Sequence, residues 1–422
     1  MRKFFISVLI GFAIFISSFG FAYAISAGSE MVRNGSRTDR KLQSQPVNLS
    51  QAGMPVVGQS ALAPDTVCRI GAFLPLSGAY SGIGLRFKHG LELALAAGKT
   101  AVFPWQIDYI DSAAISPATA LADFKKRGVN IILGPIQSSL AQPVVKAAIS
   151  LQLPLILLAP QPELTNTDRS IFQHFLNAAD EAREIVRLLR RYKETRVALL
   201  HPENSFGNLF SKVFTQSCRT QEITIWKNSG YDPAAVDFSS VIKGLRQPQA
   251  KLDLDRDRKG DAIPCYPFSA LVIADFWPRL RLIVPQLAFF GVEQQHLYAT
   301  NRGSELNFAK GADSKLDGII FIDSSFHSPH SSNLVKSYKS LYLKAYNEPA
   351  SIYDAYAYDT VRLLTEAREL MAKGEATDLV DSLLKVPSLE LLTGTTIVTA
   401  DGVFAKQLTP VTYKSGKLLQ VQ

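Results

Sequence analysis

Residues 70–84 read IGAFLPLSGAYSGIG, and this stretch decides how the rest of the sequence is interpreted. Arg69 to Leu74 has the pattern of a short apolar strand, Pro75 to Gly78 that of a turn, and Gly84 to Ala97 that of an amphipathic helix. The stretch contains no Gly-Lys-Ser/Thr and lacks the glycine spacing of a dinucleotide fingerprint. It therefore predicts a strand, a sharp turn and a helix, with the N–H groups of the turn and the Ser77 hydroxyl available to an anionic or polar ligand group.

The alternation of strands and helices continues along the chain in two successive runs. The first run has further predicted strands at 105–110, 129–133 and 155–158 and helices at 117–127 and 142–151. The second run has strands at 196–200, 223–226, 270–274, 296–299 and 318–322 and helices at 179–192, 206–218, 238–245 and 278–289. Two more helices, at 333–346 and 353–371, and hairpin strands within 395–421 follow. This spacing predicts an α/β fold with two Rossmann-like lobes, each a parallel sheet flanked by helices.

The first 24 residues have the pattern of a secretory signal peptide. Basic residues at 2–3 precede an apolar run from Phe4 to Phe21, and Ala22-Tyr23-Ala24 is a small-x-small cleavage site. Cleavage before Ile25 is expected, and a retained membrane anchor is the alternative. No cysteine follows the apolar run as an acylation site, and no later stretch is apolar for long enough to span a bilayer. The sequence thus predicts an exported, soluble, periplasmic protein.

The domain organisation follows from the same pattern. Residues 25–66 are rich in Ser, Gln, Asn, Gly and Pro and are predicted to be a flexible linker after the 1–24 signal peptide. The predicted limits of lobe 1 are 67–187 and 325–392, and those of lobe 2 are 188–324 and 393–422.

Composition and motifs limit the possible functions. The formal net charge of +8 is spread along the chain, with no basic block and interleaved aromatics, so nucleic acid is not an expected partner. The stretch Asp253–Asp261 contains Arg and Lys and lacks the spacing of a calcium loop, so no metal site is predicted. Neither Gly-x-Ser-x-Gly nor His-Glu-x-x-His occurs. A catalytic activity and a cofactor are therefore not expected.

The three cysteines are Cys68, Cys218 and Cys265, and none forms a C-x-x-C pair, which gives a zinc site no support. Cys218 ends a predicted helix and Cys265 precedes a predicted strand, and in a parallel sheet these ends share the edge away from the ligand. Cys218–Cys265 is the predicted disulfide if any forms, and three free thiols remain the alternative.

Candidate ligand-binding residues lie where predicted strands end, because open α/β sheets bind ligands beyond the carboxyl ends of their strands. These candidates are Ser77, Gly78, Ser138, Ser139, Ala159, Pro160, Phe206, Asp275, Phe276, Trp277 and Asn301.

A series of motifs in fixed order resembles the type I periplasmic solute-binding family, typified by leucine/isoleucine/valine-binding proteins. The motifs are Pro75-Leu-Ser-Gly78, Leu133-Gly-Pro135 with Ser138-Ser139, Pro162-Glu-Leu-Thr165, Val197-Ala-Leu-Leu-His201 with Phe206-Gly207, Val236-Asp-Phe-Ser239 and Tyr358-Asp-Thr-Val-Arg-Leu-Leu364. The resemblance covers nearly everything from Cys68 onward. It implies two lobes joined by three crossovers, with a ligand enclosed when they close.

The resemblance also implies roles for several site residues. In amino-acid binders of the family a Ser and a Thr hold the α-carboxylate and a Glu accepts the α-ammonium. The Ser falls at Ser138, the Thr position at Pro160 and the Glu position near Asn301, while Phe206 and Phe276-Trp277 supply aromatic side chains. Pro160 has neither hydroxyl nor N–H, and Asn301 has no charge, so weak or absent binding of free amino acids is expected. Asp275 and Arg302 are the neighbours that could restore the missing charges.

Four further segments are similar to penicillin-binding protein activators, which stimulate peptidoglycan synthases. They are Phe172-Gln-His-Phe-Leu176, Gly230-Tyr-Asp-Pro233 with Thr300-Asn301, and Pro285-Gln-Leu-Ala288. The expected function is accordingly a solute receptor with a small polar ligand, serving an ABC transporter or sensor of the branched-chain amino acid type. The alternative is an activator-like regulator of peptidoglycan synthesis, so the expected partner is an ABC permease or a peptidoglycan synthase.

Overall fold

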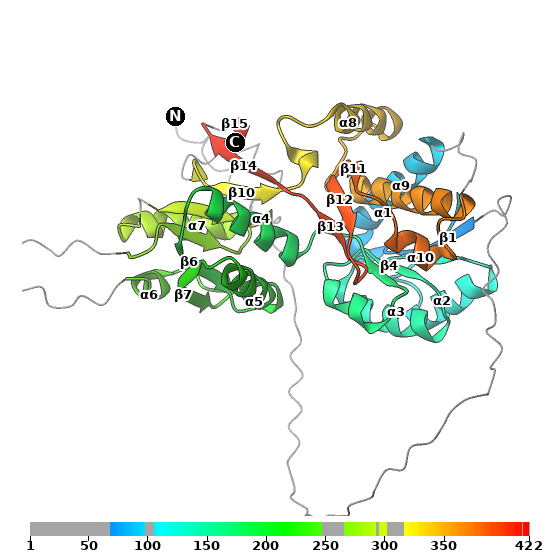
Figure 1. Ribbon diagram of the computed structural model, residues 1–422, viewed down its shortest axis with the longest axis horizontal. Coiled ribbons are helices and arrows are strands. Elements are labelled where there is room, and N and C mark those ends of the chain that lie inside the picture. Colours follow the sequence, from blue (N-terminus) through cyan, green and yellow to red (C-terminus); the bar gives the residue numbers. More distant parts are fainter. Residues whose placement is uncertain are drawn as a thin grey trace, which may run out of the picture. The chain divides into compact units, whose positions relative to one another are not determined.

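The computed structural model describes residues 68–97, 105–246, 266–292, 295–301, 316–415 and 417–421 (Figure 1). Its first sheet has the strand order β2-β1-β3-β4-β5, and every pairing in it is parallel. The strands are β1 (Cys68–Leu74), β2 (Trp105–Asp111), β3 (Ile131–Leu133), β4 (Leu155–Leu157) and β5 (Ile171–Gln173).

Helices cover both faces of this sheet, as the near-continuous apolar strands require. Alternate residues of β1 separate the two faces, because successive side chains of a strand point to opposite sides. Ile70, Ala72 and Leu74 pack in one core with α1 (Ser81–Ala97), α9 (Ile352–Ala372) and α10 (Leu379–Leu384). Phe73 packs in the other core with α2 (Pro117–Lys126) and α3 (Ser138–Ser150).

The second sheet has the order β15-β14-β10-β9-β8-β6-β7. Its parallel strands are β6 (Arg196–Pro202), β7 (Thr224–Tyr231), β8 (Ala270–Ile273), β9 (His296–Ala299) and β10 (Ile320–Asp323), and β14 (Thr409–Lys414) and β15 (Lys417–Gln420) add an antiparallel hairpin. Helices α4 (Ala178–Arg191) and α5 (Ser205–Thr220) share one core of this sheet, and α6 (Ser239–Lys243) and α7 (Trp277–Phe289) share the other.

The chain passes between the two sheets three times. It leaves β5 for α4, leaves β10 for α8 (Asn333–Tyr346), and leaves β13 (Phe404–Lys406) for β14. The strands β11 (Leu389–Leu391), β12 (Gly394–Val398) and β13 form a small antiparallel sheet whose Phe404 joins the core of the first sheet. The predicted α/β fold with two lobes and three crossovers is therefore confirmed.

The exact limits of the lobes stay a proposal. Helix α4, which the predicted limit at residues 187/188 divides, packs with its buried residues in a core of the seven-stranded sheet.

Two glycines occupy equivalent places in the two lobes. Gly84 and Gly207 each lie in the helix that follows the first strand of their sheet. A Cβ on Gly84 would lie 1.9 Å from the carbonyl oxygen of Pro75, and a Cβ on Gly207 would lie 2.0 Å from that of Pro202. Any side chain there would force the helix away from the strand end. The glycines therefore set how closely each helix approaches the carboxyl end of its strand.

Local details differ from the sequence expectation. The helix predicted from Gly84 begins at Ser81, after a 3-10 turn η1 (Gly78–Tyr80), and the strand predicted at 223–226 extends to Tyr231 because its pairing with β6 continues to Pro202. Within the described part of the chain, no helix has the length and apolar character needed to cross a membrane. Cys68 and Cys218 are buried, and Cys265 lies outside the described residues, so its pairing with Cys218 stays a prediction.

Candidate functional site

All the candidate residues lie just beyond the carboxyl ends of parallel strands. In the first sheet, Ser77 and Gly78 follow β1, Ser138 and Ser139 follow β3, and Ala159 and Pro160 follow β4. In the second sheet, Phe206 follows β6, the segment 275–277 follows β8, and Asn301 follows β9. Each set therefore lies along one edge of its own sheet. Arg302, the neighbour expected to restore a charge, lies outside the described residues.

The turn after β1 already binds a carboxylate from within the protein. Ser77 donates its hydroxyl to Asp111 Oδ2 at 2.5 Å, and the N–H of Leu76 donates to Asp111 Oδ1 at 2.9 Å. Burial opposes the ionisation of Asp111, but the Ser77 hydroxyl and backbone N–H groups outweigh it and hold the pKa of this carboxyl below its ordinary value. The donors of this turn are thus engaged by Asp111, which leaves the Ser77 oxygen as an acceptor.

The turn after β3 leaves its donors open. Ser138 and Ser139 are the first two residues of α3, both are exposed, and neither hydroxyl has a hydrogen-bond partner among the described residues. Gln137, not either serine, is the N-cap, and its side chain makes no capping hydrogen bond. The two serines are therefore the first residues of the helix and do not cap it. Their N–H groups and hydroxyls lie at the positive end of a helix dipole and suit an anionic or polar ligand group.

The turn after β4 offers little to a ligand. The carbonyl of Ala159 accepts hydrogen bonds from the Gln161 N–H at 2.9 Å and from Gln173 Nε2 at 3.1 Å. Pro160 has no N–H to donate. This turn therefore joins β4 to β5 within the first sheet and does not supply the missing hydroxyl of an amino-acid clamp.

Aromatic and acidic side chains follow β6 and β8 in the second sheet. Phe206 is half-buried and packs on Phe210 with ring centroids 6.2 Å apart. Phe276 is the N-cap of α7 and is 37% exposed, so it offers an apolar face. Asp275 is buried and accepts the Tyr231 hydroxyl at 2.8 Å, with Arg279 Nε 3.8 Å from its carboxylate. Asp275 is thus already compensated within its own lobe.

Asn301 is held by two buried carboxylates. Its N–H donates to Glu181 Oε1 at 2.9 Å and its Nδ2 donates to Asp323 Oδ1 at 3.2 Å. His327 Nδ1 also lies 3.0 Å from Asp323 Oδ1. Glu181 and Asp323 were not among the residues expected from the sequence, since Glu181 lies on a helix and Asp323 at the end of a strand, and neither is close to Asn301 in the sequence. Asn301 therefore bridges α4 and β10 at the carboxyl edge of the second sheet.

A buried polar cluster surrounds the crossovers. Lys406 of β13 is 2% exposed, and its Nζ donates to Thr396 Oγ1 at 2.8 Å and lies 5.2 Å from the ring centre of Tyr356. Burial lowers the pKa of Lys406 to about 8, while the charges of Asp359 and Asp180 act in the opposite direction.

The carboxylates around Lys406 come from both lobes. Asp359 of α9 accepts the N–H groups of Leu392 and Thr393 at 3.0 and 2.9 Å and the Thr393 hydroxyl at 2.6 Å. Burial raises the pKa of Asp359, and Lys406 acts to lower it. This cluster was also missed, because its members are scattered over more than two hundred residues of sequence. It provides a polar connection between segments that meet only in the folded chain.

His174 completes the cluster on the first crossover. It is fully buried, with Nδ1 2.8 Å from Thr360 Oγ1, and Thr360 donates its hydroxyl to the Tyr356 carbonyl at 2.8 Å. Thr360 must then accept from His174, so the proton lies on Nδ1 of a neutral ring. Burial, and after it the charge of Lys406, holds the pKa of His174 well below its ordinary value of 6.5.

No group of three His, Cys, Asp or Glu side chains in the described residues is arranged to hold a metal ion. The geometry defines the class of protein. It is an α/β protein with two lobes and three connections between them, and with hydroxyl, amide and aromatic groups at the carboxyl edges of its sheets. The family model for periplasmic binding proteins matches residues 67–417, and the chain belongs to this family.

Solved structures with the same fold include proteins named for branched-chain amino acid transport and the protein LpoA. A protein of Rhodospirillum rubrum named for a branched-chain amino acid ABC transporter has a TM-score of 0.71 at 18% identity, covering 84% of this chain and 100% of that one. LivJ of Streptococcus pneumoniae, solved with isoleucine, has a TM-score of 0.58 at 22% sequence identity, and the match covers 84% of this chain and 99% of LivJ. Full-length LpoA of Haemophilus influenzae has a TM-score of 0.64 at 17% sequence identity, and the match covers 84% of this chain and 59% of LpoA. At these identities the similarity shows the fold.

Among curated proteins, glutamate receptor 2.9 of Arabidopsis thaliana is 26% identical over 149 residues. The match covers 34% of this chain and 16% of that receptor, so the chain spans only a small part of the receptor's length.

Proposed function

We propose that this chain is an exported solute-binding protein of the receptor type, without catalytic activity, that holds a small polar ligand between its two lobes and delivers it to an ABC transporter or sensor. The observation that carries the proposal is the carboxyl edge of the first sheet at α3. There the exposed N–H groups and hydroxyls of Ser138 and Ser139 have no partner among the described residues. Phe276 at the edge of the second sheet supports it as an exposed apolar surface for the rest of the ligand.

The ligand we propose carries a carboxylate or another acidic or carbonyl group and no ammonium. Pro160 cannot donate a hydrogen bond, and Asn301 carries no charge. The nearest buried carboxylates are engaged within the protein, Asp275 by Tyr231 and Asp323 by Asn301 and His327. An ammonium placed here would compete with these hydrogen bonds. Leaving a buried cation without its own acceptor costs ~2–5 kcal/mol of binding free energy.

A thermal-shift screen of the purified protein against small carboxylic acids, amino acids and muropeptides tests the proposal. A ligand present at 100-fold its Kd stabilises the protein by about 2.7 kcal/mol. Ser138→Asp places a negative charge where the acidic group is expected and should abolish the shift. Ser332→Asp is the matched control, because Ser332 caps α8 by accepting the Val335 N–H, a role that Asp performs equally well. Equal shifts for both variants would contradict the site.

Export belongs to the same proposal, because receptors of this kind bind their solutes outside the cytoplasm. We propose a signal peptide at 1–24 and a mature chain that begins near Ile25 and is soluble in the periplasm. Amino-terminal sequencing of the exported protein tests this; a retained Met1 or a lipid-modified residue would contradict it.

A second candidate function is regulation of a peptidoglycan synthase. It is supported by the segment Phe172–Leu176, which is similar to activators of penicillin-binding proteins, and by the match to LpoA, whose carboxyl-terminal domain from Haemophilus influenzae is named as a regulator of PBP1A. Purified chain added to a peptidoglycan synthase of its own cell distinguishes the two. A stimulated rate of glycan polymerisation supports the regulator, and an unchanged rate together with a hit in the ligand screen supports the receptor.

A further inference from the structure

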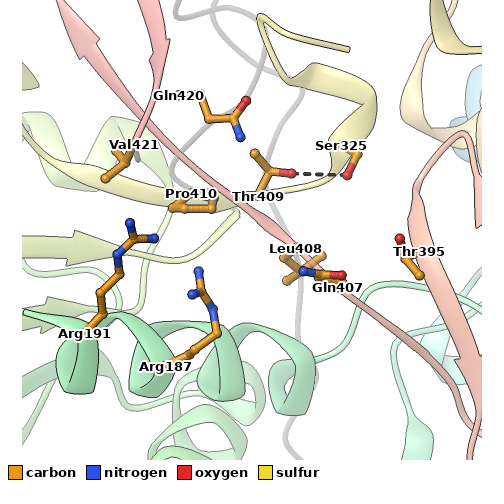
Figure 2. Close-up of a pocket in the computed structure, with 10 residues that line it drawn as sticks. All are labelled: Arg187, Arg191, Ser325, Thr395, Gln407, Leu408, Thr409, Pro410, Gln420 and Val421. Atoms are coloured by element: carbon orange, nitrogen blue, oxygen red, sulfur yellow. Dashed lines mark hydrogen bonds between the residues drawn. The ribbon is translucent and has the colours of Figure 1, made fainter. Parts of the chain in front are cut away.

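A cavity of about 450 Å³ lies beside the third crossover, and none of the candidate ligand-binding residues is among those that line it (Figure 2). Its wall is built from α4, from the segment that joins β13 to β14, and from the end of β15. The lining residues are Arg187, Arg191, Ser325, Thr395, Gln407, Leu408, Thr409, Pro410, Gln420 and Val421.

The lining contains two arginines and no carboxylate. Arg187 and Arg191 lie one helical turn apart on α4, and their side chains rise from the helix toward the strands (Figure 2). Arg187 forms two-pronged hydrogen bonds to Glu184, from Nε to Oε2 at 2.9 Å and from Nη2 to Oε1 at 2.6 Å. Arg191 has no acidic partner among the described residues, so the cavity carries a net positive charge.

Arg191 differs from the other arginines of α4 in having no side-chain hydrogen bond or ion pair among the described residues. Arg183 is paired with Asp180 at 2.8 Å, and Arg190 donates to Gln221 Oε1. A cation in the last turn of a helix is favoured by the helix dipole, which accounts for Arg190 and Arg191 alike. The dipole does not account for the donors that face Arg191 across the cavity.

Those donors come from the opposite wall. Gln420 accepts the Ser328 hydroxyl on its Oε1 at 3.2 Å, which leaves its Nε2 group as a donor. Ser325 and Thr409 share one hydrogen bond at 3.1 Å, so one hydroxyl hydrogen of the pair remains to donate. Gln407 also lines the cavity and carries an amide group. Guanidinium, amide and hydroxyl donors without a carboxylate are the groups that recognise oxyanions.

We propose that this cavity binds a small soluble oxyanion of two or more charges, such as a phosphate or a di- or tricarboxylate. Its volume falls in the range of small-ligand sites. Gln407 lies in the third crossover, between β13 and β14, and Ser325 lies in the second crossover, between β10 and α8. The anion therefore bridges α4 to two of the three connections between the sheets.

Calorimetry on the exported chain at constant ionic strength tests the proposal, with inorganic phosphate and citrate as the probes. Constant ionic strength is needed because salt screens exposed charges. Arg191→Gln should weaken binding of both probes by at least about tenfold. Arg190→Gln is the matched control, since it removes the same charge from the adjacent residue, which does not line the cavity, and it should bind like the wild type.

Three outcomes would overturn the site. One is equal weakening by Arg190→Gln and Arg191→Gln, which would indicate a general charge effect. Another is no heat from either probe up to about 10 mM in the wild type. The third is retention on vesicles of anionic phospholipid without binding of the soluble anions, which would make the cavity a membrane contact. Ser138→Asp should leave phosphate binding intact, so the outcome here is independent of the proposed receptor function.

Discussion

The backbone N–H of Lys406 donates to the carboxylate of Asp180 at 3.1 Å. This bond joins the last residue of β13, just before the third crossover, to the helix that follows the first crossover. The charge of Asp359 acts on the side chain of Lys406 and favours its protonated form. Asp359 belongs to α9, which packs on the first sheet. Lys406 thus links three segments that the sequence separates, close to two of the connections between the sheets.

Lys406→Met should destabilise the protein by about 2–4 kcal/mol, because it removes the cation that compensates two buried carboxylates. The change is measured as a shift of the urea midpoint at neutral pH with an unchanged m-value. Lys414→Met is the control, because Lys414 is an exposed residue of β14. Similar midpoints for the two variants would show that Lys406 does not compensate the carboxylates.

Acid should destabilise the fold through His174. The pKa of His174 in the folded protein lies well below 6.5, chiefly because burial disfavours the cation. Below pH 6.5 the unfolded chain takes up a proton that the folded chain does not, so stability falls as the pH falls, by up to about 1.4 kcal/mol per pH unit. His174→Asn keeps a donor toward Thr360 and should remove this part of the slope between pH 6.5 and about 5.

The comparison uses unfolding free energies at several pH values in that interval. His330→Asn, a change at an exposed histidine, should keep the wild-type slope. If His174→Asn also keeps it, His174 is not the titrating group.

Much of the fold could be predicted from the sequence because its signals are local. Most of the parallel strands, such as β3 and β8, are short apolar runs followed by a turn. The turn residues indicate the edge of the sheet at which Ser138, Phe206 and Phe276 lie. The hydrogen-bond partners of the site residues could not be predicted in this way, because they come from distant parts of the sequence. Asp111 reaches Ser77 from the end of the neighbouring strand, and His174 meets Thr360 from a position 186 residues away. A buried Lys such as Lys406 is rare unless it is paired, and its partners come from other elements.

Two glycines of α1 give opposite results when replaced by alanine. Gly84→Ala should destabilise by about 1–3 kcal/mol, because the new Cβ would lie 1.9 Å from the Pro75 carbonyl oxygen. Gly82→Ala, two residues earlier on the same helix, meets nothing within 4 Å and should stabilise by up to about 1 kcal/mol through helix propensity. Thermal unfolding measures both. Equal unfolding midpoints for the two variants would mean that the backbone around Pro75 moves away from the new Cβ at no cost in stability.

The described cysteines should be unreactive in the native protein. Cys68 and Cys218 are buried, and burial raises the pKa of the Cys218 thiol to about 12, so little thiolate forms. Titration with a thiol reagent near neutral pH should therefore detect no Cys68 or Cys218 in the folded state. Under denaturing, non-reducing conditions, one reactive thiol would support the predicted Cys218–Cys265 disulfide, and three would rule it out.

The most direct test of the central claim, a binding protein whose site does not accept an amino-acid zwitterion, is calorimetry of the mature chain with leucine and with isocaproate, the same carbon skeleton without the ammonium. Ser138 and the N-terminus of α3 can hold the carboxylate of either, but Pro160 and Asn301 provide for no ammonium. Isocaproate should bind at least about tenfold more tightly than leucine, a difference of about 1.4 kcal/mol or more. Micromolar binding of leucine, isoleucine or valine would contradict the account.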